Sequence, residues 1–409
     1  MTKNNILKRF SAGRILAILI YMLLLGNTSC KKSGDEASIP EVDEGSNKPD
    51  LKTIRAGLAD VNATDQTTSL FYIMKQLSKT KIMFGHQDAT KRGVGWANEE
   101  SKPYQPERSD VKEVSGAYPS VYGWDFNFIA GNATGAWFNY ENKVSHDLTV
   151  DAYNRGGINT YCWHYDNPVS NGSFYWDESP VEAVSKILPG GTHNDVFKRD
   201  LKKIADFSKT LIGADGKLVP VIFRPFHEFD GNWFWWGQSH CTAEEYKKLY
   251  QFTVSYLRDT LQVHNFLYAW SPDKNFNSQA QYLLRYPGDT YVDLVGMDNY
   301  GDFSANGDLS AASAKLKIVS DYAISKNKIA ALTETGLPKL TQTNWYTQSL
   351  LTALRKQPVQ LAYVLVWANR DDTYWTPYKG HVSSSDFITF KDNGYLVFGD
   401  KIPEMYRLQ

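Results

Sequence analysis

Eight short apolar runs, each ending in a polar or aromatic residue, constrain the fold of this 409-residue chain more than any other feature. A longer amphipathic or loop segment separates each run from the next, which is the pattern of alternating strands and helices. Near-continuous apolar runs such as Leu218-Val-Pro-Val-Ile-Phe223 are expected where both faces of a sheet are covered. The runs predict strands at residues 81–85, 119–124, 158–164, 218–224, 266–271, 292–297, 328–334 and 361–367, and helices at 110–116, 146–156, 194–211, 242–261, 309–326 and 345–356.

This order predicts an α/β fold, a (β/α)8 TIM barrel that forms a single catalytic domain over residues 51–409. An open doubly wound sheet is the alternative, but no glycine-rich phosphate-binding motif follows any of the runs. The active site of such a barrel lies at the C-terminal ends of its strands. Those ends carry two glutamates, Glu228 and Glu334, and four tryptophans, which are Trp124, Trp163, Trp270 and Trp367.

The N-terminal segment predicts export. Residues 1–29 hold four basic and no acidic side chains and an eleven-residue apolar run, 15–25, too short for the roughly 20 residues that span a bilayer. Cys30 follows small residues, so we expect a lipoprotein signal peptide at 1–29 and lipidation of Cys30; an ordinary cleaved signal is the alternative. Residues 30–50 are mostly polar, which predicts a flexible tether. The expected location is the bacterial outer membrane, on the cell surface or the periplasmic face.

Composition excludes some function classes and points to another. The chain has 44 basic and 45 acidic side chains, and loss of residues 1–29 leaves it mildly acidic, so nothing indicates nucleic-acid binding. Aromatic residues make up 14% of the chain, and the many indoles and phenols suggest a surface that stacks on a ligand. Cys162 and Cys241 either form one bridge or are free thiols.

Glu228 and Glu334 suggest hydrolysis of a glycosidic bond, which needs two carboxyl groups flanking that bond. The aromatic run 233–236 after Glu228 is expected to raise its pKa, and the hydroxyls of Thr333 and Thr335 to keep Glu334 ionised. For either glutamate alone the alternative is a structural ion pair, with Arg224 as the partner of Glu228. A zinc protease is excluded because position 231, where HExxH needs its second histidine, is glycine, and no GxSxG motif is present.

Two segments carry a family resemblance: Arg224-Pro-Phe-His-Glu-Phe-Asp-Gly-Asn-Trp-Phe-Trp-Trp-Gly237 and Leu332-Thr-Glu-Thr-Gly336. Over about residues 65–409 the chain resembles glycoside hydrolase family 26, whose best-known members are β-mannanases. The resemblance implies a retaining enzyme with Glu228 as acid/base and Glu334 as nucleophile. It also implies no metal or organic cofactor, and these supporting residues: His164 as a sugar ligand, His227 beside the acid/base, Trp233 as an aromatic wall, Tyr300 on the nucleophile and Trp367 beneath the sugar.

The expected substrate site is an aromatic rim with a few polar groups. The rim comprises Trp163, Trp233, Trp270, Trp367 and Tyr300, with Tyr175 and Trp176 as additions and Asp298, Asn299 and Arg370 for sugar hydroxyls. Ala368 stands where mannanases of the family often carry an arginine. We therefore expect a monomer that acts on β-mannan, galactomannan or glucomannan and meets a membrane only through its lipid. The alternatives are another substrate, β-1,3-xylan or mixed-linkage β-glucan, or a glycan-binding lipoprotein without catalysis.

Overall fold

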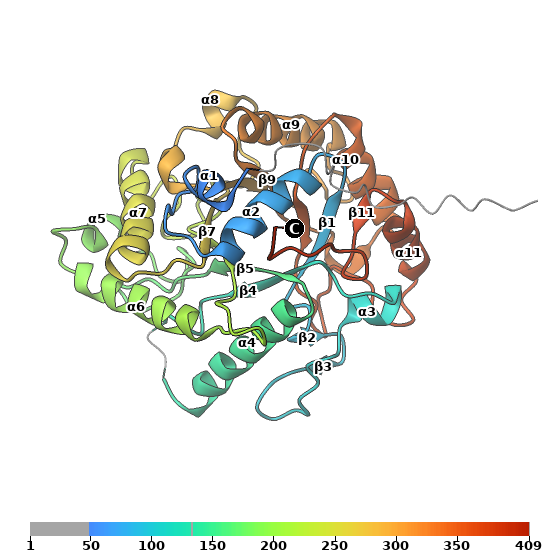
Figure 1. The fold of residues 1–409 in the computed structure, drawn as a ribbon, viewed down its shortest axis with the longest axis horizontal. Coiled ribbons are helices and arrows are strands. Elements are labelled where there is room, and N and C mark those ends of the chain that lie inside the picture. Colours follow the sequence, from blue (N-terminus) through green and yellow to red (C-terminus); the bar gives the residue numbers. More distant parts are fainter. Residues whose placement is uncertain (1–48, 132–133, 409) are drawn as a thin grey trace, which may run out of the picture. The chain divides into compact units, whose positions relative to one another are not determined.

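The computed structural model describes residues 49–131 and 134–408, and eight parallel strands in it form a closed barrel (Figure 1). Each strand pairs with the next in the chain, and β1 closes the ring by pairing with both β4 and β10. The predicted (β/α)8 barrel is confirmed, and each of the eight predicted runs overlaps one of its strands. These are β1 (Ile82–Gln87), β4 (Val121–Asp125), β5 (Ile158–Trp163), β6 (Val221–Pro225), β7 (Phe266–Trp270), β8 (Leu294–Asp298), β9 (Ile329–Thr335) and β10 (Tyr363–Val366).

Helices surround the barrel because each has an apolar face to bury against the sheet. All six predicted helices are present, although two of them contain a π-helical stretch, Tyr256–Thr260 after α7 and Tyr346–Leu351 before α10. The helices around the barrel are α3 (Asp110–Ser115), α4 (Ala136–Asn154), α5 (Val184–Ile187), α6 (Asn194–Thr210), α7 (Ala243–Ser255), α8 (Gln279–Tyr282), α9 (Leu309–Ser325), α10 (Thr352–Lys356) and α11 (Ser384–Asp392).

Helix α4 begins ten residues before the predicted start at 146. Its first turn contains Trp137 and Phe138, which pack edge to face on each other, and Trp137 also packs on Phe128. Later in the same extra turns, Val144 is buried in the core and Glu141 pairs with the buried Lys91 (2.8 Å).

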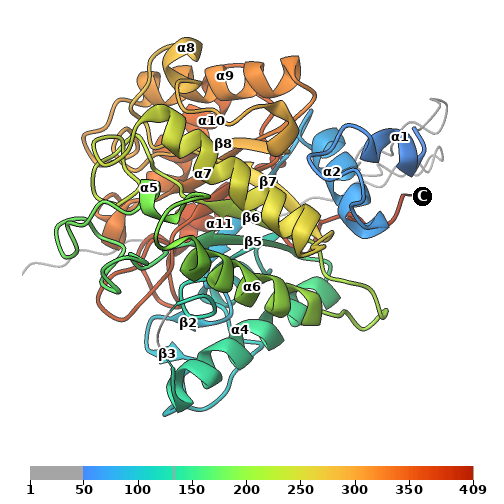
Figure 2. The same cartoon turned by 90° about the vertical axis from the view of Figure 1, so that its left-hand side faces the viewer.

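Two helices that were not predicted from the sequence lie across the N-terminal end of the barrel, α1 (Leu51–Arg55) and α2 (Asp65–Leu77) (Figures 1 and 2). The segment between them is bonded to the chain just before two strands: Ala59 N–H donates to Asp293 (2.7 Å) and Thr64 N–H to the His264 carbonyl (2.8 Å). The short strand β11 (Leu396–Val397) pairs with the start of β1, and β2 (Arg92–Gly93) with β3 (Trp96–Ala97). The opposite end, with the C-terminal ends of the strands and the loops that follow them, is called the mouth below.

Within the described part of the chain, every helix is too short or too polar to cross a membrane. The expected lipidation site, Cys30, and the predicted signal segment lie outside the described residues.

Candidate active site

The strand ends place five of the expected residues at the mouth. Glu228 follows β6 by three residues, and Glu334 is the second-to-last residue of β9, so the two glutamates lie at the fourth and seventh strands of the barrel. His164 directly follows β5, Trp367 directly follows β10, and Tyr300 follows β8 by two residues.

Glu334 is buried and hydrogen-bonded at both carboxylate oxygens. Arg224, a buried residue of β6, donates to Oε1, and the Tyr300 hydroxyl donates to Oε2 (2.9 Å). The Tyr300 contact is the one that the family resemblance implies. Protein donors therefore hold both oxygens of the Glu334 carboxylate in place.

The same guanidinium joins Glu334 to a second buried carboxylate. Arg224 donates to Asp298 Oδ2 (2.6 Å) and to Ser271 Oγ (3.1 Å). Asp298 is fully buried and also accepts from the Thr333 hydroxyl (2.6 Å), so it holds Arg224 in place.

One expectation and one alternative interpretation about these groups are wrong. The hydroxyls of Thr333 and Thr335 do not serve Glu334, because Thr333 donates to Asp298 and Thr335 to the Asn299 carbonyl (2.8 Å). Arg224 pairs with Glu334 and Asp298, not with Glu228. The pairing of β8 with β9 shifts register between Met297 and Asp298, which explains why Thr333 and Glu334 both reach the Arg224–Asp298 pair although they are consecutive.

Glu228 has a contrasting environment. It is half-buried, and burial, followed by the nearby Asp298 and Glu334 carboxylates and by Asp273, raises its pKa well above the usual range for glutamate. The indole N–H of Trp233 donates to Oε2 (2.7 Å) and opposes this rise because it stabilises the ionised form. A raised pKa keeps Glu228 protonated where an ordinary glutamate has ionised, as a general acid requires.

The backbone around Glu228 is strained. Phe226 (φ 52°) and Glu228 (φ 54°) both lie in the left-handed region, at a cost of about 1–3 kcal/mol each for side chains of this kind. Gly231 lets Trp233 fold back toward Glu228, since a Cβ at position 231 would lie 2.2 Å from the indole ring. The local chain is thus built to bring the Trp233 N–H to the carboxylate.

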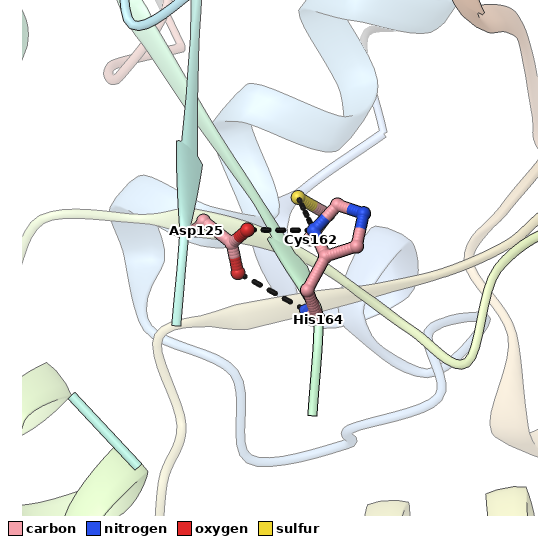
Figure 3. Close-up of side chains that lie close together, drawn as sticks. All are labelled: Asp125, Cys162 and His164. Atoms are coloured by element: carbon pink, nitrogen blue, oxygen red, sulfur yellow. Dashed lines mark hydrogen bonds and ion pairs between the residues drawn. The ribbon is translucent and has the colours of Figure 1, made fainter. Parts of the chain in front are cut away.

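His164, Asp125 and Cys162 lie together at the ends of β4 and β5 (Figure 3). Asp125 Oδ2 is 2.6 Å from His164 Nδ1, and Oδ1 accepts the backbone N–H groups of His164 (3.1 Å) and Asn127 (2.9 Å). Burial lowers the pKa of His164, but the Asp125 carboxylate outweighs it and raises the pKa above the usual value. Asp125 therefore fixes the ring through Nδ1.

Two groups of side chains at the mouth have the donor types that metal ions prefer. In the first group, of Asp125, Cys162 and His164, Cys162 Sγ lies 3.7 Å from His164 Nδ1, but that nitrogen is already hydrogen-bonded to Asp125. Burial also raises the pKa of the Cys162 thiol, which disfavours the thiolate form that binds a metal. In the second group, of His227, Asp298 and Glu334, the Arg224 guanidinium already pairs with both carboxylates.

Cys162 and Cys241 are both free thiols, which is one of the two alternatives predicted from the sequence.

His227 is buried below His164, and their rings meet edge to face at 4.8 Å. Burial, Arg224 and His164 lower its pKa well below the usual value, so the ring is neutral. Its Nε2 lies 3.9 Å from Glu334 Oε1. His227 thus lies against the predicted nucleophile as well as next to Glu228 in the chain.

The aromatic wall at the mouth is smaller than expected. Trp233 (38% exposed) and Tyr175 (43% exposed) face solvent, and Trp367 is half-buried with its ring against that of His164 (5.9 Å). The Trp176 backbone N–H donates to the Trp233 carbonyl (2.7 Å), and its ring stacks on His240 at 3.6 Å. Trp176 therefore supports the wall through the backbone of Trp233.

The expectation that Trp163 and Trp270 belong to the rim is wrong, because both are buried, as is Trp124 at the end of β4. Side chains alternate along a strand, and Trp163, between the inward-facing Cys162 and His164, packs outward on Phe197 of α6. Trp270 packs on Phe229, Tyr282 and Tyr286, and Trp124 donates to Asn159 (2.8 Å).

The polar residues also differ from expectation. Asp298 and Asn299 are buried and occupied by protein partners, Arg224 and Asp302 respectively, so neither is free to bind a sugar hydroxyl. Arg370 is exposed and Ala368 is buried. Asp125 was not among the predicted site residues, although it directly follows the predicted strand 119–124, and Arg224 was not predicted as the partner of Glu334.

Comparison with known proteins agrees with this geometry. Residues 59–391 match the model of glycosyl hydrolase family 26. A mannan endo-1,4-beta-mannosidase of Bifidobacterium adolescentis is 36% identical over 367 residues, which cover 84% of this chain and 36% of that protein, so the chain spans about a third of that relative's length. The structure of GH26C from Muricauda sp. MAR_2010_75 has a TM-score of 0.83 at 41% identity and covers 89% of this chain and 100% of its own. The structure of the GH26 beta-mannanase BoMan26A from Bacteroides ovatus has a TM-score of 0.77 at 35% identity and covers 85% and 98%.

Proposed function

The chain belongs to glycosyl hydrolase family 26, and from that membership we propose that it is an endo-acting β-1,4-mannanase that works by double displacement with retention. Glu228 is the acid/base and Glu334 the nucleophile. The observation that carries the proposal is the contrast between these two carboxyl groups at one mouth. Glu334 accepts hydrogen bonds from Arg224 and Tyr300, whereas burial and neighbouring carboxylates raise the pKa of Glu228.

In the first step a carboxylate oxygen of Glu334 forms a bond to the anomeric carbon of the sugar, and the bond from that carbon to the glycosidic oxygen breaks. The leaving oxygen takes the proton of Glu228. In the second step Glu228, now ionised, takes a proton from water, whose oxygen bonds to the anomeric carbon as the ester to Glu334 breaks. Both glutamates return to their starting states.

The similar proteins are mannan endo-1,4-beta-mannosidases and a GH26 beta-mannanase, which supports mannan as the substrate. Ala368 is buried and carries no hydrogen-bonding side chain, so the next basic residue, the exposed Arg370, is our candidate for binding the sugar beyond the cleavage site. Trp367, Trp233 and the Nε2 atom of His164 complete the proposed binding surface.

Two variants test the catalytic proposal. Glu228→Ala and Glu334→Ala should each lose at least about three orders of magnitude in turnover of galactomannan while keeping the melting temperature within a few degrees of the wild type. Product profiles on mannan, galactomannan, mixed-linkage glucan and β-1,3-xylan identify the substrate. Near-normal turnover by either variant would refute the assignment, and tight retention of mannan without new reducing ends would favour a binding protein.

We also propose that the mature protein is an outer-membrane lipoprotein anchored at Cys30. The basic leader, its short apolar run and the cysteine at its end support this. Labelled palmitate should enter the wild-type chain expressed in a Gram-negative host and not the Cys30→Ser variant. Equal labelling of both chains, or of neither, would contradict the proposal.

A further inference from the structure

The turn that carries Glu228 depends on bonds to the next strand of the barrel. Phe226 and Glu228 both have the left-handed backbone that side chains of their kind disfavour, so the turn needs partners outside itself. The backbone N–H of Glu228 donates to the Ser271 carbonyl (3.0 Å), directly after β7. One end of the turn is therefore fixed to the loop that follows the neighbouring strand.

Asp230 fixes the other end to the same loop. Its Oδ1 accepts the backbone N–H of Asp273 (2.6 Å) and its Oδ2 that of Asn275 (3.0 Å). The Asn275 side chain donates in return to the Asp230 carbonyl (3.3 Å). Since a carboxylate offers acceptors only, it matches two backbone donors in a way that an amide does not.

The loop that Asp230 binds, residues 271–275, is also hydrogen-bonded to Arg224 and Asp298. Ser271 Oγ accepts from Arg224 (3.1 Å), and the Pro272 carbonyl accepts the Asp298 N–H (2.8 Å). A displacement at Asp230 therefore moves Glu228 relative to the Arg224–Asp298 pair that holds Glu334.

We propose that Asp230 is a positioning residue, a clamp that holds the Glu228 carboxyl where it can pass its proton to the leaving oxygen. This inference rests on the proposed role of Glu228. Its loss affects the acid step selectively, because a displaced acid matters when the leaving group needs a proton and matters little when it leaves as a stable anion.

The chain offers a matched control at the other end of the barrel. Asp293 accepts the backbone N–H groups of Ala59 (2.7 Å) and Tyr268 (2.9 Å), also one with each carboxylate oxygen. Asp293→Asn thus makes the same chemical change as Asp230→Asn, leaving a donor opposite a donor, but far from the mouth.

The test uses phenyl and 2,4-dinitrophenyl β-mannobiosides with the full chain. We expect Asp230→Asn to lose at least tenfold more kcat/KM on the phenyl substrate than on the dinitrophenyl one, and Asp293→Asn to lose equally on both, within about twofold. Equal losses on both substrates for Asp230→Asn would overturn the clamp.

If Asp230→Asn melts below the assay temperature, Asn275→Ala must show the same selectivity, at about threefold. Equal losses on both substrates for Asn275→Ala would then overturn the proposal. A wild type inert on both substrates would instead refute the proposed function, and the clamp with it.

Discussion

Trp233→Phe removes a hydrogen bond that opposes the rise in the pKa of Glu228. The variant keeps an aromatic ring but removes the indole N–H that lies 2.7 Å from Oε2. A hydrogen bond to a charged group contributes about 1.5–3 kcal/mol, and we take about 1 kcal/mol because Trp233 is 38% exposed to screening solvent. At 1.36 kcal/mol for each unit, the pKa of Glu228 should rise by about 0.7 units.

The pH profile of kcat/KM measures this shift, because its alkaline limb reports the loss of the proton from the acid in the free enzyme. We expect the limb of Trp233→Phe to move upward by about 0.7 pH units. Trp176→Phe is the control, since that indole stacks on His240 and should leave the limb in place. An unchanged limb, or a downward shift, would refute the reasoning that Trp233 favours the ionised form of Glu228.

Three further variants test the arrangement around the glutamates. Arg224→Met leaves Asp298 and Glu334 buried without their cation, so the free energy of unfolding in urea should fall by about 3–5 kcal/mol; a change below 1 kcal/mol would contradict the ion-pair assignment. Asp125→Asn should lower the pKa of His164 in an NMR titration. Because the pKa of His164 is raised in the folded state, its pair with Asp125 stabilises the fold fully below about pH 6.5, and this stabilisation is lost as the pH rises through the folded pKa. The Asp125→Asn variant should therefore lose more stability at pH 5.5 than at pH 9. Equal losses at the two pH values would count against the pair. Trp163→Ala should lower the free energy of unfolding by about 3–5 kcal/mol and leave KM within about twofold of the wild type. Trp367→Ala should instead raise KM about tenfold with little loss of stability. The reverse pattern would show that Trp163 belongs to the sugar-binding surface.

The barrel was predictable because its signal is local. Each strand is an apolar run, and the order of strands and helices leaves few topologies. The positions of Glu228 and Glu334 at the fourth and seventh strands followed directly. Helix α2 was not predicted, although Thr64 caps it and its buried residues recur with helical spacing.

The errors at the mouth come from side-chain direction. Trp163 and His164 are neighbours in sequence, but the alternation of a strand sends one into the core and the other to the mouth. The period of two along a strand distinguishes Trp163 from His164, because successive side chains point to opposite faces. The Arg224 pairing could not be read in this way, because the register shift beside Asp298 breaks the alternation.

Long-range contacts were out of reach for a different reason. Asp230 bonds to backbone amides 43 and 45 residues away, and any residue type other than proline offers such an amide, so the partners leave no signal in the sequence. The acidic residue after Glu228 was visible, but its function depends on a loop whose path only the structure shows.

Trapping the covalent intermediate tests the central claim most directly. An activated 2-deoxy-2-fluoro-β-mannobioside should inactivate the enzyme, because the fluorine slows both steps and the good leaving group restores the rate of the first step only. Peptide mass spectrometry should then find one fluorosugar for each chain, on the peptide that contains Glu334. An adduct on Glu228 or on another residue, or an active enzyme whose first product has the inverted anomeric configuration, would contradict the account.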